Sequence, residues 1–167
     1  MTRVAVLIVV LAALVLGAWF TTGPHSPVFP WLVGLGGFGA LGLVGRLPEK
    51  VVPRPVRTPG PKAIAVARAL GVPAVLGLLD AVGWNRRLGR GRHTVRGRGG
   101  LREVRVAATS SLTSHWCGVV FHAVVAASLA VAGAWPGVIV TLLLGALLHG
   151  VPVLMQRYLL ARIARVT

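Results

Sequence analysis

Hydrophobic residues in this chain fall into four long runs, with one pair near each end. The first pair covers about residues 4–20 and 28–45, and the second pair covers about 114–133 and 136–156. A helix needs about 20 largely apolar residues to cross the hydrocarbon core of a bilayer. The pattern therefore predicts an all-α polytopic membrane protein with four transmembrane helices arranged as two hairpins.

Glycine and proline interrupt the second pair of runs. Residues 106–156 contain no Asp, Glu, Lys or Arg, and the sequence AGAWPG at 132–137 divides them. Gly and Pro break helices and Trp prefers the membrane interface, so we predict a hairpin with its tip at Trp135. Further on, Pro152 lacks the amide that would bond the Leu148 carbonyl, which predicts a kink and an exposed carbonyl beside a histidine.

The segment between the two pairs, residues 46–112, carries most of the charge. Fourteen of the 18 Lys and Arg residues lie there. We expect a cytoplasmic, interfacial segment in four parts. These are an extended connector at 51–61, which contains four prolines; an interfacial or shallow re-entrant helix at 63–84, anchored by Trp84; a solvated Arg/Gly loop at 85–100; and a helix at 101–114 that continues into the third span.

The distribution of basic residues predicts the orientation. Lys and Arg are absent from the connections 21–27 and 133–137, whereas the middle segment and the C-terminal tail are basic. Because basic short loops stay in the cytoplasm, we expect both termini to be cytoplasmic. The first run follows Arg3 and can be read as a signal peptide, but its length and the lack of a small-x-small site favour an uncleaved anchor. Without internal repeats, residues 1–167 are predicted to form a single domain.

The net charge of +15 indicates that the chain binds a negatively charged partner, either nucleic acid or anionic lipid. The arginines are concentrated beside the predicted membrane and are not interleaved with aromatic residues, so nucleic acid is not expected. Anionic lipid headgroups are the expected counter-charge, at about 1 kcal/mol per basic residue near the surface. The single cysteine, Cys117, excludes an internal disulfide and is interpreted as a small packing residue.

Small residues within the spans indicate close helix packing. Glycines recur every third position in the second span, and two small residues lie four apart in the fourth. We interpret them as contacts within one chain, with a homo-oligomer through the glycine-rich second span as the alternative. The positions are Gly36, Gly39, Gly42 and Gly45, followed by Ala146 and Gly150.

Three histidines are the ionisable residues expected inside the membrane, where such groups are costly and usually face the bundle interior. At 1.5 Å per residue, His122 and His149 should lie at the same depth on neighbouring helices, with His115 higher, at the membrane surface. This predicts a polar seam with His122 and His149 at its base and with His115, Ser111, Gln156 and Arg157 at its mouth. Structural hydrogen bonding between helices is the alternative. The differing depths and the lack of a nearby carboxylate argue against a metal site.

Short motifs in the second half of the chain resemble a known family. The ending Gly150–Tyr158 (GVPVLMQRY), followed by Arg162, and the pair His115-Trp116 after a basic helix resemble bacterial membrane proteins related to glycosyl-4,4'-diaponeurosporenoate acyltransferase. Residues 70–72 (LGV) with 83–86 (GWNR) resemble its central region. The resemblance implies an enzyme of the bacterial cell membrane that esterifies the sugar of a carotenoid glycoside, a lipid-like substrate, with a fatty acyl chain.

Acyl transfer to a hydroxyl needs a base and donors for the developing oxyanion. With this chemistry, His115, Ser111 and Gln156 are the candidate catalytic residues, with His115 as the base. The candidate substrate-binding residues are Arg157, Tyr158, His122, His149 and Trp116. No bound cofactor is expected. Acyl-CoA is the candidate acyl donor, its phosphates held by Arg157 or the loop arginines.

Two departures from the family keep other functions open. Members carry acidic residues in the two turns before the His-Trp pair and Asn-Arg after Gln-Arg-Tyr, but this chain has Ala107, Ala108 and Ser111, then Leu159-Leu160. Neither a Gly-x-Ser-x-Gly elbow nor a His followed five residues later by Asp occurs. A non-enzymatic membrane protein that binds lipid or a partner, and a transporter subunit that uses the histidines as an ion path, remain alternatives.

Overall fold

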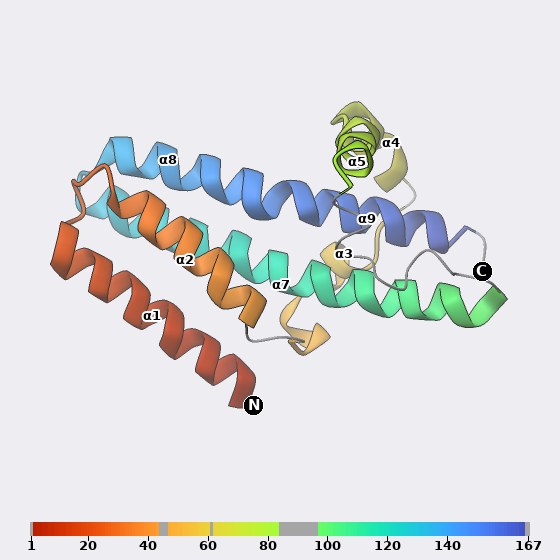
Figure 1. Cartoon of the computed structure of the whole chain (residues 1–167), viewed down its shortest axis with the longest axis horizontal. Coiled ribbons are helices and arrows are strands. Elements are labelled where there is room, and N and C mark those ends of the chain that lie inside the picture. Colours follow the sequence, from red (N-terminus) through yellow and green to blue (C-terminus); the bar gives the residue numbers. More distant parts are fainter. Residues whose placement is uncertain (1, 44–46, 61, 84–96, 166–167) are drawn as a thin grey trace. The chain divides into compact units, whose positions relative to one another are not determined.

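The computed structural model describes residues 2–43, 47–60, 62–83 and 97–165, and within these ranges every regular element is a helix (Figure 1). The all-α prediction is therefore confirmed for the described part of the chain. The chain divides into two compact units, each built from two separate segments. One unit comprises Met1–Val51 with Thr113–Pro152, and the other comprises Val52–Leu112 with Val153–Thr167. The prediction of a single domain stays a prediction.

The first unit contains two helical hairpins. Its helices are α1 (Thr2–Thr22), α2 (Phe29–Leu43), a short 3₁₀ turn η1 (Glu49–Val51), the later part of α7 (Gly97–Val131), α8 (Trp135–Gly145) and the π-turn η3 (Ala146–Gly150). Helix α1 packs along α2, and α2 packs along α8. The predicted break after the third run is confirmed, since α7 ends at Val131 and α8 begins at Trp135.

Among the described residues, three helices are long and apolar enough to cross a membrane: Arg3–Thr22, Gly100–Val131 and Trp135–Ile163. They correspond to the first, third and fourth predicted spans, and the last two extend into the basic segment and the tail. The second run forms a shorter apolar helix, since α2 has 15 residues and rises only about 22 Å. Part of the predicted range 28–45 lies outside the described residues.

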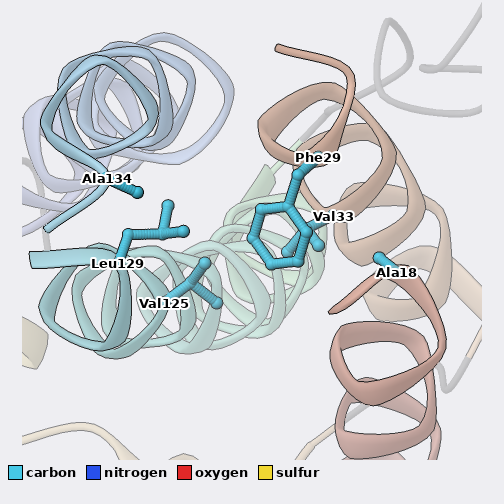
Figure 2. Close-up of a cluster of buried hydrophobic side chains, with 6 residues drawn as sticks. All are labelled: Ala18, Phe29, Val33, Val125, Leu129 and Ala134. Atoms are coloured by element: carbon cyan, nitrogen blue, oxygen red, sulfur yellow. The ribbon is translucent and has the colours of Figure 1, made fainter. Parts of the chain in front are cut away.

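The two hairpin turns lie at the same end of the first unit. A β-carbon placed on Gly137, just after the second turn, would lie 3.7 Å from the Pro24 carbonyl oxygen in the first. A core cluster beneath them joins all four helices (Figure 2). Its members are Ala18 from α1, Phe29 and Val33 from α2, Val125 and Leu129 from α7, and Ala134 before α8. The two connections that lack basic residues therefore share one end.

The glycines of α2 pack differently from the predicted stripe. A β-carbon on Gly36 would meet the Leu14 side chain at 2.8 Å, and one on Gly37 would overlap the Phe121 ring. At Gly39 and Gly42, by contrast, no atom of the described residues lies within 4 Å of an added β-carbon. The prediction that glycines at every third position form one packing face is wrong. Three residues rotate about 300° around the helix axis, so successive glycines turn away from the neighbouring helix. Gly45 lies outside the described residues.

The two small residues of the fourth span, Ala146 and Gly150, also do not form the predicted contact with another helix. A β-carbon on Gly150 would meet only the Gly145 carbonyl oxygen, at 3.8 Å, and Ala146, at 4.0 Å. Both atoms belong to the same chain segment, one turn earlier. Small residues four apart thus pack within their own helix here, and the prediction of close helix packing is wrong at this pair.

The second unit contains α3 (Arg54–Arg57), α4 (Ala63–Ala69), α5 (Val72–Ala81), the first part of α7 and most of α9 (Val151–Ile163). Its core is small. Side chains from α4, the start of α5 and α9 form a buried cluster of Ile64, Ala67, Val72, Tyr158 and Ala161. Part of the basic segment therefore packs against α9 around a small apolar core.

Three predictions for this segment need correction. The proline-rich connector contains the helical turn α3, because proline is tolerated in the first turn of a helix, where its missing amide has no partner. The apolar stretch from residue 63 forms two helices, bent by 68° at Gly71, whose φ of 72° ends α4. Helix α7 already begins at Gly97, inside the predicted loop. Trp84 and the rest of the loop to residue 96 lie outside the described residues.

Candidate functional site: a cluster of three histidines

Helix α7 places two of the three histidines on one face. His115 and His122 are seven residues apart, which is close to two full turns and about 10.5 Å of rise. The returning chain brings His149 between them, so that its ring centroid lies 5.4 Å from that of His115 and 5.0 Å from that of His122. One imidazole thus contacts two others that are too far apart to touch each other.

This arrangement confirms that His122 and His149 are neighbours on adjacent helices and corrects the predicted depths. His122 and His149 do lie side by side on neighbouring helices. His115 was predicted to lie higher, but its Nδ1 is 3.3 Å from the Nδ1 of His149, so it belongs to the same cluster. The reason is that His149 sits at a depth between the two α7 histidines rather than level with the deeper one.

The three rings differ in exposure. His122 and His149 are each 1% exposed, whereas His115 is only half-buried. His115 is therefore the member of the cluster that a substrate group can reach directly.

The hydrogen bonds restrict where protons sit on the rings. His122 Nδ1 lies 2.9 Å from the Gly118 carbonyl oxygen, which can only accept, so this nitrogen carries a hydrogen. Between His115 and His149, one Nδ1 donates and the other accepts. The Nε2 atoms of His122 and His149 are buried and have no hydrogen-bond partner among the described residues. Buried polar atoms in this state are unusual in proteins and point to a functional or ligand-dependent role.

Glycines make room for the rings. A β-carbon on Gly118 would overlap the His149 ring, and one on Gly145 would lie 2.7 Å from the β-carbon of His122. On α2, a β-carbon on Gly34 would lie 3.5 Å from His122 Nε2. The missing side chains of Gly118 and Gly145 therefore leave the space that the His149 and His122 rings occupy.

Aromatic rings cover the cluster. Phe38 from α2 lies 5.7 Å from His149 and 6.4 Å from His115, measured between ring centroids. Phe121 meets His122 edge-on at 5.4 Å. These rings surround the buried imidazoles with apolar surface, which strengthens the hydrogen bonds inside.

The predicted irregularity before Pro152 takes the form of the π-turn η3. The Val151 amide bonds the Ala146 carbonyl five residues earlier, and His149 lies within this turn. Because Pro152 has no amide hydrogen, it cannot bond the Leu148 carbonyl. That carbonyl approaches the ring of His115, in place of the predicted His149. π-Turns of this kind are often found at functional sites.

The other predicted site residues lie in different surroundings. Trp116 is half-buried on α7, next to His115. The remaining four belong to the second unit. Ser111 is half-buried on α7, and Gln156 has a buried Oε1 without a partner among the described residues. Arg157 Nη1 donates to the Pro55 and Val56 carbonyls, and Tyr158 is buried in that unit's core with Arg162 over its ring.

Sequence reasoning missed several residues that shape the cluster. Gly118 and Gly145 seat the rings, and Phe38 covers them. Thr141, one turn before Gly145, is 1% exposed, and its hydroxyl has no partner within the described part of the chain. A glycine four residues before His122 was the available signal, because a small residue facing a histidine leaves space for a ring from another helix.

In the ranges that the structure describes, no group of three or more His, Cys, Asp and Glu side chains is arranged to hold a metal ion. The imidazoles of the cluster can accept and donate protons.

Comparison with known proteins identifies one family. A sequence model described as glycosyl-4,4'-diaponeurosporenoate acyltransferase matches residues 57–167, which is 111 of the 167 residues. The match includes all three clustered histidines. No curated protein and no solved structure matches the chain.

Proposed function

Because this chain belongs to the glycosyl-4,4'-diaponeurosporenoate acyltransferase family, we propose that it is a membrane-embedded acyltransferase. It moves a fatty acyl group to a hydroxyl of a lipid or carotenoid glycoside at the cytoplasmic face of the membrane. The observation that carries the proposal is the histidine cluster inside the matched region, with one accessible ring hydrogen-bonded to a buried one.

The reaction joins an acyl thioester and an alcohol. The hydroxyl oxygen attacks the thioester carbonyl carbon, the new C–O bond forms and the C–S bond breaks. A base must take the hydroxyl proton and return it to the departing thiolate. An imidazole near neutrality suits both steps, because it accepts and releases protons in the physiological range.

His115 is the residue best suited to be this base. It is the half-buried member of the cluster, whereas the other two imidazoles are almost completely enclosed. It also lies in an apolar setting, next to Phe38. A base in such a setting reacts without competition from bulk water, which protects the thioester from hydrolysis.

Several further roles are proposals that follow the sequence predictions. Ser111 and Gln156 are the candidate hydrogen-bond donors for the oxyanion, and Trp116, Arg157 and Tyr158 are candidate substrate contacts. Acyl-CoA is the candidate donor because its phosphates match the basic character of residues 46–112. The same basic residues suit anionic lipid headgroups.

We further propose that the chain crosses the membrane four times, with both termini in the cytoplasm. The two connections without Lys or Arg lie at one end of the first unit, which supports their placement together on the outer side. Helix α2 is the proposed second span, although its 15 described residues make it shorter than the other three. A bacterial cell membrane is the location that the family implies.

The alternative is a non-enzymatic membrane protein that binds lipid or a partner. One observation favours it: Ala107, Ala108 and Ser111 precede His115, so no acid is present in the two turns before the proposed base. In that case the histidine cluster locks the helices together by hydrogen bonds.

Replacement of His115 separates the two functions. The chain is expressed in a bacterial host that makes a carotenoid glycoside, and acylated glycolipids are measured by mass spectrometry of the membranes. His115→Gln is expected to lower the acylated product by about 100-fold or more, because a general base contributes 10²–10⁴-fold. His25→Gln, in the connection after α1, is the matched control. An unchanged lipid profile with normal membrane accumulation of His115→Gln supports the non-enzymatic alternative.

A further inference from the structure

His149 contacts the proposed base but is itself closed off from substrate. Its Nδ1 lies 3.3 Å from that of His115, and only 1% of the residue is exposed. We propose that His149 is a positioning residue: it accepts the Nδ1 proton of His115 and so leaves Nε2 of His115 free to take the substrate proton. This inference rests on the proposed function of His115 as the base.

The direction of this hydrogen bond decides whether His115 can act. A neutral imidazole carries one hydrogen, so His115 can accept at Nε2 only when its hydrogen is on Nδ1. That hydrogen then needs an acceptor. Nδ1 of His149 supplies one in the tautomer of His149 whose own hydrogen is on Nε2. The opposite arrangement would place the hydrogen of His115 on Nε2 and block the reaction there.

The same bond remains in place throughout the transfer. As the substrate oxygen attacks the thioester carbon, its proton moves to Nε2 of His115, and Nδ1 keeps its hydrogen on His149. When the C–S bond breaks, the proton on Nε2 passes to the thiolate. His149 thus acts as a neutral acceptor in the place where a serine-type catalytic triad has a carboxylate.

The surroundings hold His149 in this position. The missing side chain of Gly118 provides the space for its ring, and Phe38 covers it from α2. Among the described residues, the ionisable groups that act on His149 are His122 and His115, both from α7. His122 uses its own Nδ1 hydrogen on the Gly118 carbonyl, so it does not compete with His115 for Nδ1 of His149.

A kinetic experiment tests the positioning role. The purified full chain in lipid nanodiscs is assayed with a fatty acyl-CoA and a carotenoid glucoside across a range of pH. His149→Leu is expected to lower turnover by about 10- to 100-fold and to move the acidic limb of the pH profile to lower pH, because protonated His115 loses its acceptor. His149→Gln, which offers a carbonyl acceptor, is expected to restore part of the rate and the original limb. His25→Gln, in the connection after α1, is the control and is expected to leave both the turnover and the limb in place.

A structural readout does not depend on activity. Nitrogen-15 NMR of histidine-labelled wild-type protein reports which ring nitrogen carries the hydrogen. Neutral His115 is expected to carry it on Nδ1, and a hydrogen on Nε2 would overturn the proposal.

The outcomes separate the two proposals. If His115→Gln abolishes transfer while His149→Leu leaves both turnover and the pH profile unchanged, the positioning role is wrong and the enzymatic function stands. If the unmutated chain transfers no acyl group, the proposed function fails. If His115→Gln retains full transfer, His115 is not the base, and the positioning role of His149 fails with it.

Discussion

One nitrogen of the Arg157 guanidinium bonds the carbonyl oxygen of Val56, 101 residues away in the sequence, at 2.6 Å. The same Nη1 also bonds the carbonyl of Pro55 at 2.7 Å. Both carbonyls lie in the single helical turn α3, which leaves its last carbonyls without partners inside the helix. Arg157, predicted from the sequence to bind substrate, thus also ties the proline-rich connector to α9.

This contact predicts a stability effect. Arg157→Ala is expected to destabilise the protein by about 1.5 kcal/mol, the low end for a charged hydrogen bond, because one of the two bonds is exposed. Thermal unfolding in detergent micelles measures it. The exposed Arg165→Ala is the control, with no expected change. If Arg157→Ala alters only the Michaelis constant and not the unfolding temperature, the hydrogen bonds from Arg157 to α3 do not stabilise the fold.

Two neighbouring glycines of α2 are expected to respond in opposite ways to alanine. At Gly37 the new β-carbon would lie 2.5 Å from the Phe121 ring, and we expect a loss of about 1–3 kcal/mol from overpacking. At Gly39 nothing lies within 4 Å, so the better helix propensity of alanine should leave stability equal or slightly higher. Unfolding midpoints of Gly37→Ala and Gly39→Ala in the same detergent give the comparison. Equal midpoints would contradict the packing of α2 on α7.

Gly71 is expected to be needed for the bend between α4 and α5. Its φ of 72° is a left-handed conformation that costs other residues about 1–2 kcal/mol. Gly71→Ala should therefore lower stability by about that amount, whereas Gly77→Ala in the middle of α5, with nothing within 4 Å, should not. Circular dichroism melts of both variants test this. A gain of helix content in Gly71→Ala without loss of stability would mean that the two helices can form one.

The proposed orientation can be read from single cysteines. With Cys117 replaced by Ser, new cysteines at Ser26 and Ala132 mark the two hairpin turns, and one at Gly60 marks the basic segment. A membrane-impermeant maleimide added to intact spheroplasts is expected to label the two turns, and Gly60→Cys only after lysis. Labelling of Gly60→Cys in intact cells would reverse the topology.

Much of the helical layout follows from the sequence, because hydrophobic length and helix breakers act locally. Long apolar runs give helices long enough to span, and AGAWPG separates α7 from α8, since Gly133 adopts a φ of 73° that suits glycine. The pairing of His122 with His149 was also predictable, because helical rise converts sequence distance into depth. The family resemblance carried by the His-Trp and Gln-Arg-Tyr motifs is confirmed.

Other features depended on contacts between segments far apart in the sequence. Periodicity alone does not say which face of α2 meets another helix, so Gly39 and Gly42 were predicted to pack and do not. The rise per residue gives positions along one helix, but it does not give the axial shift of the adjacent helix. For this reason the sequence predicts His115 outside the cluster that it joins.

The sequence by itself determined that this chain is helical and apolar, where its second hairpin turns and to which family it belongs, because these properties follow from residue type and local spacing. Only the tertiary structure decided that Gly118 admits the His149 ring between two α7 histidines, and that His115 alone of the three is accessible. The position of the His149 ring and the exposure of His115 depend on how side chains from separate helices pack against one another. The sequence of one segment does not specify that packing.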